Sequence, residues 1–206
     1  MLRLFVGVEL PDPVKQALVL AQGGVEGARW QTAEQLHLTL RFIGNVDRRA
    51  AEDVRDALAR VAFAPFQVAL AGVGLFGKPR SPRALYAGVV DPQPLKALRD
   101  RIEQALVRSG LEPERRKYKP HVTLARFAGR RPGRLESYLA SHAGLTATPF
   151  TLTRFALFSS HLSHNGARYE VIDGYPAGLQ AMAGQDGVDP AEVTGPEQTQ
   201  VDQQRP

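Results

Sequence analysis

The sequence predicts an α+β protein of two lobes, each with an antiparallel sheet and helices, around a central cleft. Two observations lead to this fold class. A strand, helix, strand order recurs in both halves of the 206-residue chain. Each half also holds one His-x-Thr-Leu strand, at residues 37–40 and 121–124, so the copies lie 84 positions apart. We therefore expect an internal duplication that places one such strand on each side of the cleft.

Start signals and apolar periodicity place the elements along the chain. Pro13 follows Asp12 in the first turn of one expected helix, and Asp47 is placed to cap a second. A third helix follows Pro92, and a fourth starts at Pro132. Apolar runs predict strands over residues 2–9, 35–43, 66–75, 83–90, 150–160 and 168–172, besides the second His-x-Thr strand.

The composition is that of a soluble globular protein, with 43% hydrophobic and 23% charged residues. The absence of cysteine excludes disulfides, thiolate metal sites and a catalytic cysteine, and it fits a cytoplasmic protein. No stretch approaches the roughly 20 apolar residues of a membrane helix. The first apolar run is interrupted by Glu9 and is too short for a signal sequence. We expect a cytoplasmic monomer that does not bind a membrane.

The net charge of +5 conceals two differently charged regions. Residues 177–206 carry five acids against Arg205 and little that could be buried, so we expect a disordered tail there. Residues 1–176, the expected two-lobed domain, hold 25 basic and 16 acidic residues, a net charge of +9. Eight basic residues and no acid lie from Arg115 to Arg134. Such a run is commonly a solvated face, but its position around the second His-x-Thr strand favours a rim that binds a polyanion.

The two motifs suggest acid–base chemistry. Alternate side chains of a strand share a face, so His37 and Thr39 point one way while their neighbours anchor in the core, and His121 and Thr123 do the same. With unperturbed pKa values near 6.5, one imidazole can be protonated and the other neutral at pH 7. A general acid would then face a general base, as in-line attack at phosphorus requires. The threonine hydroxyls could donate to the non-bridging oxygens, and a nearby arginine could offset the developing charge.

Two structural alternatives compete with this interpretation. The motif residues could be half-buried strand residues, with each imidazole satisfied by a backbone carbonyl. Two chance copies among five histidines are improbable, however. A zinc site is disfavoured because the sequence has no His-x-x-x-His, no cysteine and no carboxylate near the motifs. We expect neither a metal nor a cofactor, and we expect His142, His161 and His164 at the surface.

The motifs resemble those of the 2H phosphoesterases and, more narrowly, the LigT-like RNA 2′,3′-cyclic phosphodiesterases long called 2′-5′ RNA ligases. The resemblance covers about residues 2–176. Tyr86 stands where the family has Trp and Tyr118 where it has Phe, and both keep an aromatic ring. The resemblance is carried by residues 4–8, Trp30-(x)₆-His37-Leu38-Thr39-Leu40-Arg41-Phe42-Ile43-Gly44, residues 82–89, Lys119-Pro120-His121-Val122-Thr123-Leu124-Ala125-Arg126 and residues 160–169.

The resemblance implies a two-lobed fold with a pseudo-twofold axis and a water-filled cleft. It also implies hydrolysis of RNA 2′,3′-cyclic phosphate ends to 2′-phosphomonoesters, with slow reversible 2′-5′ joining, and tRNA fragments are one candidate substrate. In this scheme His37 is the general acid that protonates the leaving O3′, and His121 is the base that activates water. The other implied site residues are Thr39, Thr123 and Arg126 for phosphate, and Phe42 and Tyr118 for stacking on a base.

Two other functions stay open at the level of the residues. One is a protein that binds RNA ends or tRNA with little catalysis, which would keep its RNA affinity after replacement of both histidines by Ala. The other is an enzyme for a small cyclic phosphate, such as a cyclic nucleotide or ADP-ribose cyclic phosphate. A long RNA that contacts several of the basic residues should bind more weakly as salt rises, whereas a small substrate should respond little.

Overall fold

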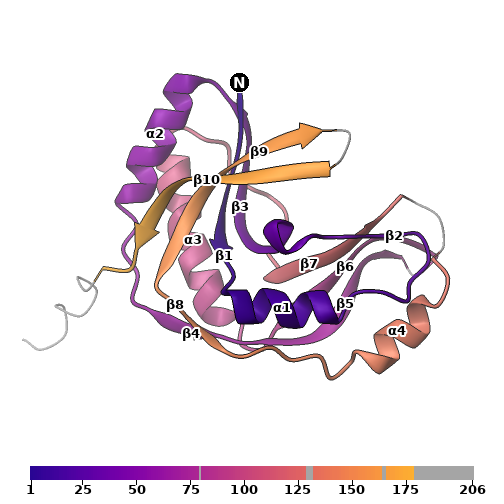
Figure 1. Cartoon of the computed structure of the whole chain (residues 1–206). Coiled ribbons are helices and arrows are strands. Elements are labelled where there is room, and N and C mark those ends of the chain that lie inside the picture. Colours follow the sequence, from indigo (N-terminus) through magenta and orange to yellow (C-terminus); the bar gives the residue numbers. More distant parts are fainter. Residues whose placement is uncertain (79, 129–131, 164–165, 179–206) are drawn as a thin grey trace, which may run out of the picture.

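The computed structural model describes residues 1–78, 80–128, 132–163 and 166–178 (Figure 1). It has the predicted α+β class, with antiparallel strands and four α-helices in these ranges. The elements are β1 (Leu2–Glu9), α1 (Asp12–Leu20), β2 (Ala28–Trp30), the 3-10 helix η1 (Ala33–Gln35), β3 (His37–Val46), α2 (Arg48–Ala59), β4 (Phe66–Val68), β5 (Leu70–Lys78), β6 (Ser81–Val89), α3 (Gln93–Arg108), β7 (His121–Phe127), α4 (Leu135–Ser141), β8 (Phe150–Leu152), β9 (Arg154–Ser163) and β10 (Gly166–Pro176).

The order of elements repeats once along the chain. The first half runs β1, α1, β3, α2, β4 and β5, and the second half runs β6, α3, β7, α4, β8 and β9. Within the described ranges, β2, η1 and β10 have no counterpart in the other half. The two His-x-Thr motifs begin β3 and β7, which hold the same place in this order. The duplication expected from the motifs therefore extends to six elements of each half.

The strands form one sheet with the order β10-β9-β1-β3-β7-β6-β5, to which β2 adds beside β7, and a separate β4–β8 pair. Each half lends its last strand to the other, because β9 pairs with β1 and β5 pairs with β6. Two further pairings between the halves join equivalent strands: β3 with β7, at Leu38 and Val122, and β4 with β8. Pairing of equivalent strands is what a twofold relation between the halves requires.

Burial of apolar side chains holds the helices to the sheet. Leu18 of α1, Leu58 of α2 and Leu106 of α3 are fully buried in one core that also contains the inward residues of the strands. Burying a leucine side chain contributes roughly 1.5–3 kcal/mol. Helices α2 and α3 pack against each other, and α1 and α4 lie toward the other end of the molecule (Figure 1). None of the described helices is long and apolar enough to cross a membrane.

Local signals account for most element boundaries. The Asp47 side chain accepts a hydrogen bond of 2.8 Å from the Ala50 amide and so caps α2 as predicted. Pro13 lies in the first turn of α1, also as predicted. The strand predicted over residues 66–75 is divided into β4 and β5, and β2 was not predicted. A three-residue strand carries too little periodicity to be seen in a sequence.

The predicted tail lies almost entirely outside the described residues. Residues 179–206 belong to that part, so disorder beyond the domain stays a prediction. The two described residues past the expected boundary are hydrogen-bonded to the domain. The Ala177 amide donates to the Thr153 carbonyl at 2.7 Å, and the Gly178 amide donates to the Phe63 carbonyl at 3.2 Å.

Candidate functional site

The pairing of Leu38 with Val122 brings the two motifs side by side at the centre of the sheet. Both of these residues are fully buried, while the His and Thr on either side of each are partly exposed. In an antiparallel pair with this register, each motif histidine lies toward the threonine of the other strand. The structure thus gathers the four predicted side chains on one face of the sheet, here called the site face: His37, Thr39, His121 and Thr123.

Both imidazoles are tethered in the same way. Nδ1 of His37 lies 2.8 Å from the Gln35 carbonyl oxygen, and Nδ1 of His121 lies 2.7 Å from the Lys119 carbonyl oxygen. Because a carbonyl can only accept, Nδ1 carries the proton of each neutral ring, and Nε2 is the acceptor. The Thr39 hydroxyl, 3.0 Å from Nε2 of His37, donates to it. The backbone therefore orients both rings with Nε2 available for proton transfer.

A bulge in each motif strand brings one further residue to the site face. The pairing register shifts where β3 lies against β1 and where β7 lies against β6. Two consecutive residues are buried at each bulge, Leu40-Arg41 and Leu124-Ala125, instead of alternating. Phe42 and Arg126, each five positions past its histidine, are consequently exposed. Strict alternation would have turned both of them toward the core.

The bulge in β3 also turns Arg41 into the protein. Its guanidinium pairs with Glu103 of α3, and both side chains are largely buried. The second Glu103 oxygen accepts a hydrogen bond of 2.7 Å from the Glu114 amide. This buried pair therefore connects β3 to α3 and to the segment that carries Arg116. Removing one partner of such a pair leaves an uncompensated charge and is strongly destabilising.

Burial and nearby positive charge keep both imidazoles neutral. Burial lowers the pKa of His37 to about 4, and the charges of Arg126 and His121 act in the same direction. Burial also lowers the pKa of His121, with Arg126 and Lys119 contributing. Both rings are therefore uncharged at pH 7 in the free protein, which differs from the expectation that one would be protonated. Arg126, the arginine predicted to bind phosphate, lies close enough to lower the pKa of both imidazoles.

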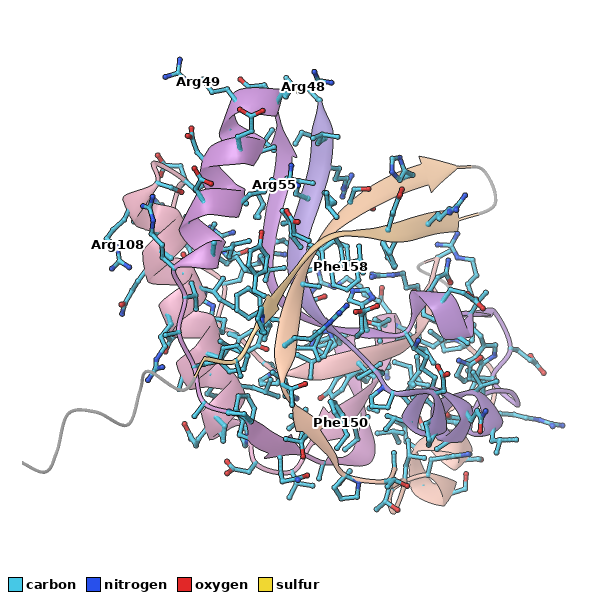
Figure 2. The ribbon with its side chains drawn as sticks, turned by 60° about the vertical axis from the view of Figure 1, so that its left-hand side comes forward. Arg48, Arg49, Arg55, Arg108, Phe150 and Phe158 are labelled. Carbon is cyan, nitrogen blue, oxygen red and sulfur yellow. The ribbon has the colours of Figure 1, made fainter. Side chains whose placement is uncertain are left out.

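Each imidazole also packs against two aromatic rings from equivalent strands. The imidazole on β3 lies 4.8 Å from Phe5 of β1 and 6.0 Å from Phe158 of β9, measured between ring centroids; Figure 2 shows Phe158 on β9. The imidazole on β7 lies 5.5 Å from Tyr86 of β6 and 4.7 Å from Phe76 of β5. These rings were not predicted as site residues. The near repeat of Leu-Phe-Val-Gly-Val at 4–8 and Leu-Tyr-Ala-Gly-Val at 85–89 was the available signal.

The first half of the site is covered by β10. The ring of Tyr169 meets the His37 ring edge-on, with 4.8 Å between the centroids. The Gln35 side chain donates a hydrogen bond of 2.8 Å to the Ala167 carbonyl and so fastens the same strand. Because β10 has no counterpart in the other half among the described elements, His121 lacks an equivalent cover.

The second half opens beside a cavity of about 600 Å³. Nζ of Lys119 lies 4.6 Å from the ring centroid of Tyr86 and donates to its hydroxyl. Lys119 was predicted as part of the motif and of the basic run but not as a site residue, and its charge lies next to His121. Aromatic and basic residues line much of this cavity: Phe76, Tyr86, Lys96, Lys117, Tyr118 and Lys119.

The two predicted stacking residues lie in different places. Tyr118 lines the cavity and donates a hydrogen bond of 3.2 Å to the Thr39 carbonyl, and burial raises the pKa of its hydroxyl. Phe42 lies outside the cavity lining and is 48% exposed. The Arg116 guanidinium, paired with Glu114 at 2.6 Å, lies 5.9 Å from the Phe42 ring centroid. Neither ring is fully buried, so both present apolar surface that a base could contact.

The basic run does not form one patch. Its first part, from Arg115 to Lys119, precedes β7, and Arg134 follows β7 at the start of α4. The seven-residue strand between these parts spans roughly 23 Å. Arg130 and Arg131 lie outside the described residues. The described part of the run therefore lies at both ends of β7 and, at Arg126, on the site face between them.

The other described histidines lie apart from the site. His142 is partly buried, since its ring stacks on Tyr138 with 4.0 Å between centroids. His161 is exposed on β9, and His164 lies outside the described residues. The Ser159 hydroxyl and Glu170 both lie nearest the same nitrogen of His161, so they do not form a serine–histidine–carboxylate relay. Within the described ranges, no three or more histidine, aspartate or glutamate side chains are grouped so that they could hold a metal ion.

Comparison with known proteins agrees with this geometry. A family model described as the 2'-5' RNA ligase superfamily matches residues 13–163. A Geobacillus stearothermophilus protein named RNA 2',3'-cyclic phosphodiesterase is 32% identical over 179 residues, which are 84% of this chain and 56% of that protein. The chain thus spans just over half of that relative's length. A Thermus thermophilus protein of the same name is 34% identical over 94% of this chain and 97% of its own length.

The fold is also similar to that of a solved structure. The structure of E. coli LigT complexed with 3'-AMP superposes with a TM-score of 0.70 over 85% of this chain and 98% of that one, at 23% identity. The family match is consistent with the paired His-x-Thr strands and with the repeated order of elements. The chain belongs to the 2'-5' RNA ligase superfamily.

Proposed function

We propose that this protein hydrolyses the 2′,3′-cyclic phosphate at an RNA end to a 2′-phosphomonoester, without a metal. The observation that carries the proposal is the pairing of Leu38 with Val122, which gathers two imidazoles and two hydroxyls on one face. The Geobacillus and Thermus relatives that carry the name RNA 2',3'-cyclic phosphodiesterase support the same reaction.

The proposed reaction is in-line attack of water on phosphorus. Nε2 of His121 takes a proton from the water as the new P–O bond forms. The P–O3′ bond breaks, and Nε2 of His37 gives a proton to O3′, which leaves the phosphate on O2′. A positioned acid and a positioned base each contribute typically 10²–10⁴-fold. The carbonyls of Gln35 and Lys119 support this arrangement because they hold both rings with Nε2 accessible.

His37 can act as the acid only after it has gained a proton. In the free protein its pKa is about 4, so the neutral ring dominates at pH 7. A bound phosphate anion favours the charged imidazolium and raises this pKa. The Thr39 hydroxyl, which donates to Nε2 in the free protein, then turns to a phosphate oxygen. In 2′-5′ joining, a 5′-hydroxyl attacks the cyclic phosphate in place of water, so His121 and His37 keep these roles. The two histidines exchange roles when the 2′-5′ bond is cleaved back to the cyclic phosphate.

The remaining site residues bind the substrate in this proposal. Thr39 and Thr123 donate to the non-bridging oxygens, and Arg126 offsets the charge that develops on the phosphate. The position of Arg126 on the site face and its effect on both imidazoles support this role. Tyr118 and Phe42 are the proposed stacking surfaces for a base.

The proposed substrate is single-stranded RNA with a cyclic phosphate end, including tRNA fragments, and the proposed state is a cytoplasmic monomer. Basic residues at both ends of β7 support a polyanion rather than a small ligand. A small cyclic nucleotide turned over with little dependence on salt would contradict the RNA part of the proposal. Sedimentation and cell fractionation would test the oligomeric state and the location.

The test is hydrolysis of an oligoribonucleotide with a 2′,3′-cyclic phosphate end in the presence of EDTA. We expect a 2′-phosphate product, with turnover at least ~100-fold lower in His37→Ala and in His121→Ala. His161→Ala, which removes an exposed histidine outside the site, should turn over normally. Unchanged turnover in either site variant would contradict the mechanism. RNA binding without turnover in the native protein would indicate a binding protein instead.

A further inference from the structure

Two arginines face each other next to the histidines. Arg29 on β2 is paired directly with Arg126 on β7, so their side chains leave the same face of the sheet. Both residues are exposed. Arg126 is the residue that the bulge in β7 brings to the site face, so Arg29 lies on that face as well.

The structure fixes Arg29 in this position through its neighbours. Trp30, the next residue, turns the other way and packs on Tyr138 with 5.6 Å between ring centroids. The Gln31 amide then donates to the Leu124 carbonyl at 2.9 Å and extends the pairing toward the bulge. A strand of three residues is thus anchored by a tryptophan on one face and presents an arginine on the other.

The arginine pair has no counter-charge among the described residues. None of the ion pairs found there includes Arg29 or Arg126. Like charges directly opposite each other on neighbouring strands are destabilising. An anion lying between or across the two guanidinium groups would remove this repulsion and gain charge-assisted hydrogen bonds.

The two arginines do not reach the histidines equally. Arg126 is among the charges that act on both His37 and His121, whereas Arg29 is not. Arg126 is therefore the nearer of the two to both histidines, and Arg29 lies one strand farther out. In a nucleic acid strand the next phosphate is one nucleotide away from the terminal one. Arg29 lies beside Arg126 but farther from the histidines, and this position fits a contact with that next phosphate.

We propose that Arg29 forms a second phosphate subsite beside Arg126, which binds the phosphodiester preceding the terminal nucleotide of the RNA. The proposal rests on the proposed function, since it names the substrate class of the same site. It predicts that the protein distinguishes an oligonucleotide from a mononucleotide through this one charge.

The test compares two substrates in Arg29→Gln, a change that removes the charge and keeps a hydrogen-bonding side chain. One substrate is a mononucleoside 2′,3′-cyclic phosphate, and the other is a dinucleotide with the same end and one internal phosphodiester. We expect kcat/KM to fall about tenfold for the dinucleotide and less than about twofold for the mononucleotide. Arg49→Gln is the matched control, because Arg49 projects into solvent from the start of α2 (Figure 2).

An equal loss on both substrates would overturn the proposal, because Arg29 would then act on the reacting phosphate or on the fold. No loss on either substrate would overturn it as well. If the native protein cleaved neither substrate, the proposed function itself would fail, and a binding measurement would still decide the subsite.

That measurement is the affinity for a single-stranded oligoribonucleotide ending in a 2′-phosphate, titrated at several salt concentrations. Each phosphate contact to a single strand contributes about 0.7 to the slope of log affinity against log salt. We expect the slope to decrease by about 0.7 in Arg29→Gln and to stay the same in Arg49→Gln. An unchanged slope in Arg29→Gln would show that Arg29 contacts no phosphate.

Discussion

His37 and His121 are tethered alike but lie in different surroundings. Each ring is held by the carbonyl two residues before it and packs on two aromatic rings from equivalent strands. In the first half, β10 places Tyr169 against the imidazole. In the second half, the described structure instead has Lys119 and a cavity of about 600 Å³. The duplication therefore sets where the imidazoles lie. Strand β10, which has no counterpart in the other half among the described elements, sets how accessible each imidazole is.

This difference assigns the two halves different tasks. The covered histidine has the more strongly shifted pKa, about 4, because burial disfavours its charged form. The open half offers a volume in the range of small-ligand pockets, with lysines and aromatic rings on its walls. In the proposed reaction, the nucleotide would enter from the open side at His121, and the covered side would shield the proton transfer at His37 from solvent.

Among changes that leave both histidines in place, the largest effect should come from the motif hydroxyls. We expect Thr39→Val and Thr123→Val each to lower kcat about 10- to 100-fold, because each removes a donor to the phosphoryl oxygens while keeping the side-chain shape. Thr151→Val on β8, outside the site, is the matched control. Single-turnover kinetics would measure the chemical step, and a loss below twofold in both variants would remove the hydroxyls from the mechanism.

Gly74 on β5 gives a test that acts on the packing around His121 alone. A Cβ there would collide with the Tyr86 ring, which packs on His121. We expect Gly74→Ala to lower the free energy of unfolding by about 1–3 kcal/mol. In Gly144→Ala, the control, the added Cβ meets nothing within 4 Å. Denaturant unfolding compares the two, and equal stabilities would show that Tyr86 adapts without cost.

The pH dependence of kcat/KM should reflect the free protein. The pair must hold one proton, the pKa of His37 is about 4, and that of His121 also lies below its usual value near 6.5. We expect a bell-shaped pH profile of kcat/KM with its maximum below pH 6.5. At pH values above this maximum, kcat/KM should fall by up to nearly tenfold per pH unit. The descending limb of kcat should lie at higher pH, because the bound phosphate favours the charged imidazole. A kcat/KM maximum near pH 8 would contradict both shifts.

The smallest effect should follow from removing the Tyr169 ring, which covers His37. Tyr169→Ala exposes His37, so its pKa should rise toward 6.5 by on the order of one unit, while that of His121 stays unchanged. Tyr169→Phe keeps the ring and should leave both pKa values in place. NMR titration of the imidazole protons would measure this. Equal changes at the two histidines would contradict the separation of the halves.

The sequence predicted the features that depend on local pattern. Alternation along the His-x-Thr strands predicted that His37 and Thr39 would share a face, and the Asp47 cap was visible as a local signal. The repeat of the motif also predicted the duplication of elements. These features need only the spacing of residues along one strand or one helical turn.

The sequence could not predict features that depend on pairing between strands. The bulges that expose Phe42 and Arg126 are visible only as register shifts against β1 and β6. The short strand β2 exists because it pairs with β7 past the point where β3 diverges. The neutral state of the imidazoles at pH 7 likewise follows from burial, which an unperturbed pKa cannot anticipate.

The most direct test of the account is whether the two histidines act as one unit. We would compare turnover of a cyclic-phosphate oligoribonucleotide by the native protein, His37→Ala, His121→Ala and the double variant, all in EDTA. If the two rings act together in one transition state, each single variant loses at least ~100-fold and the double variant is little worse than the poorer single one. Losses that multiply in the double variant, or normal turnover in either single variant, would contradict a shared acid–base pair.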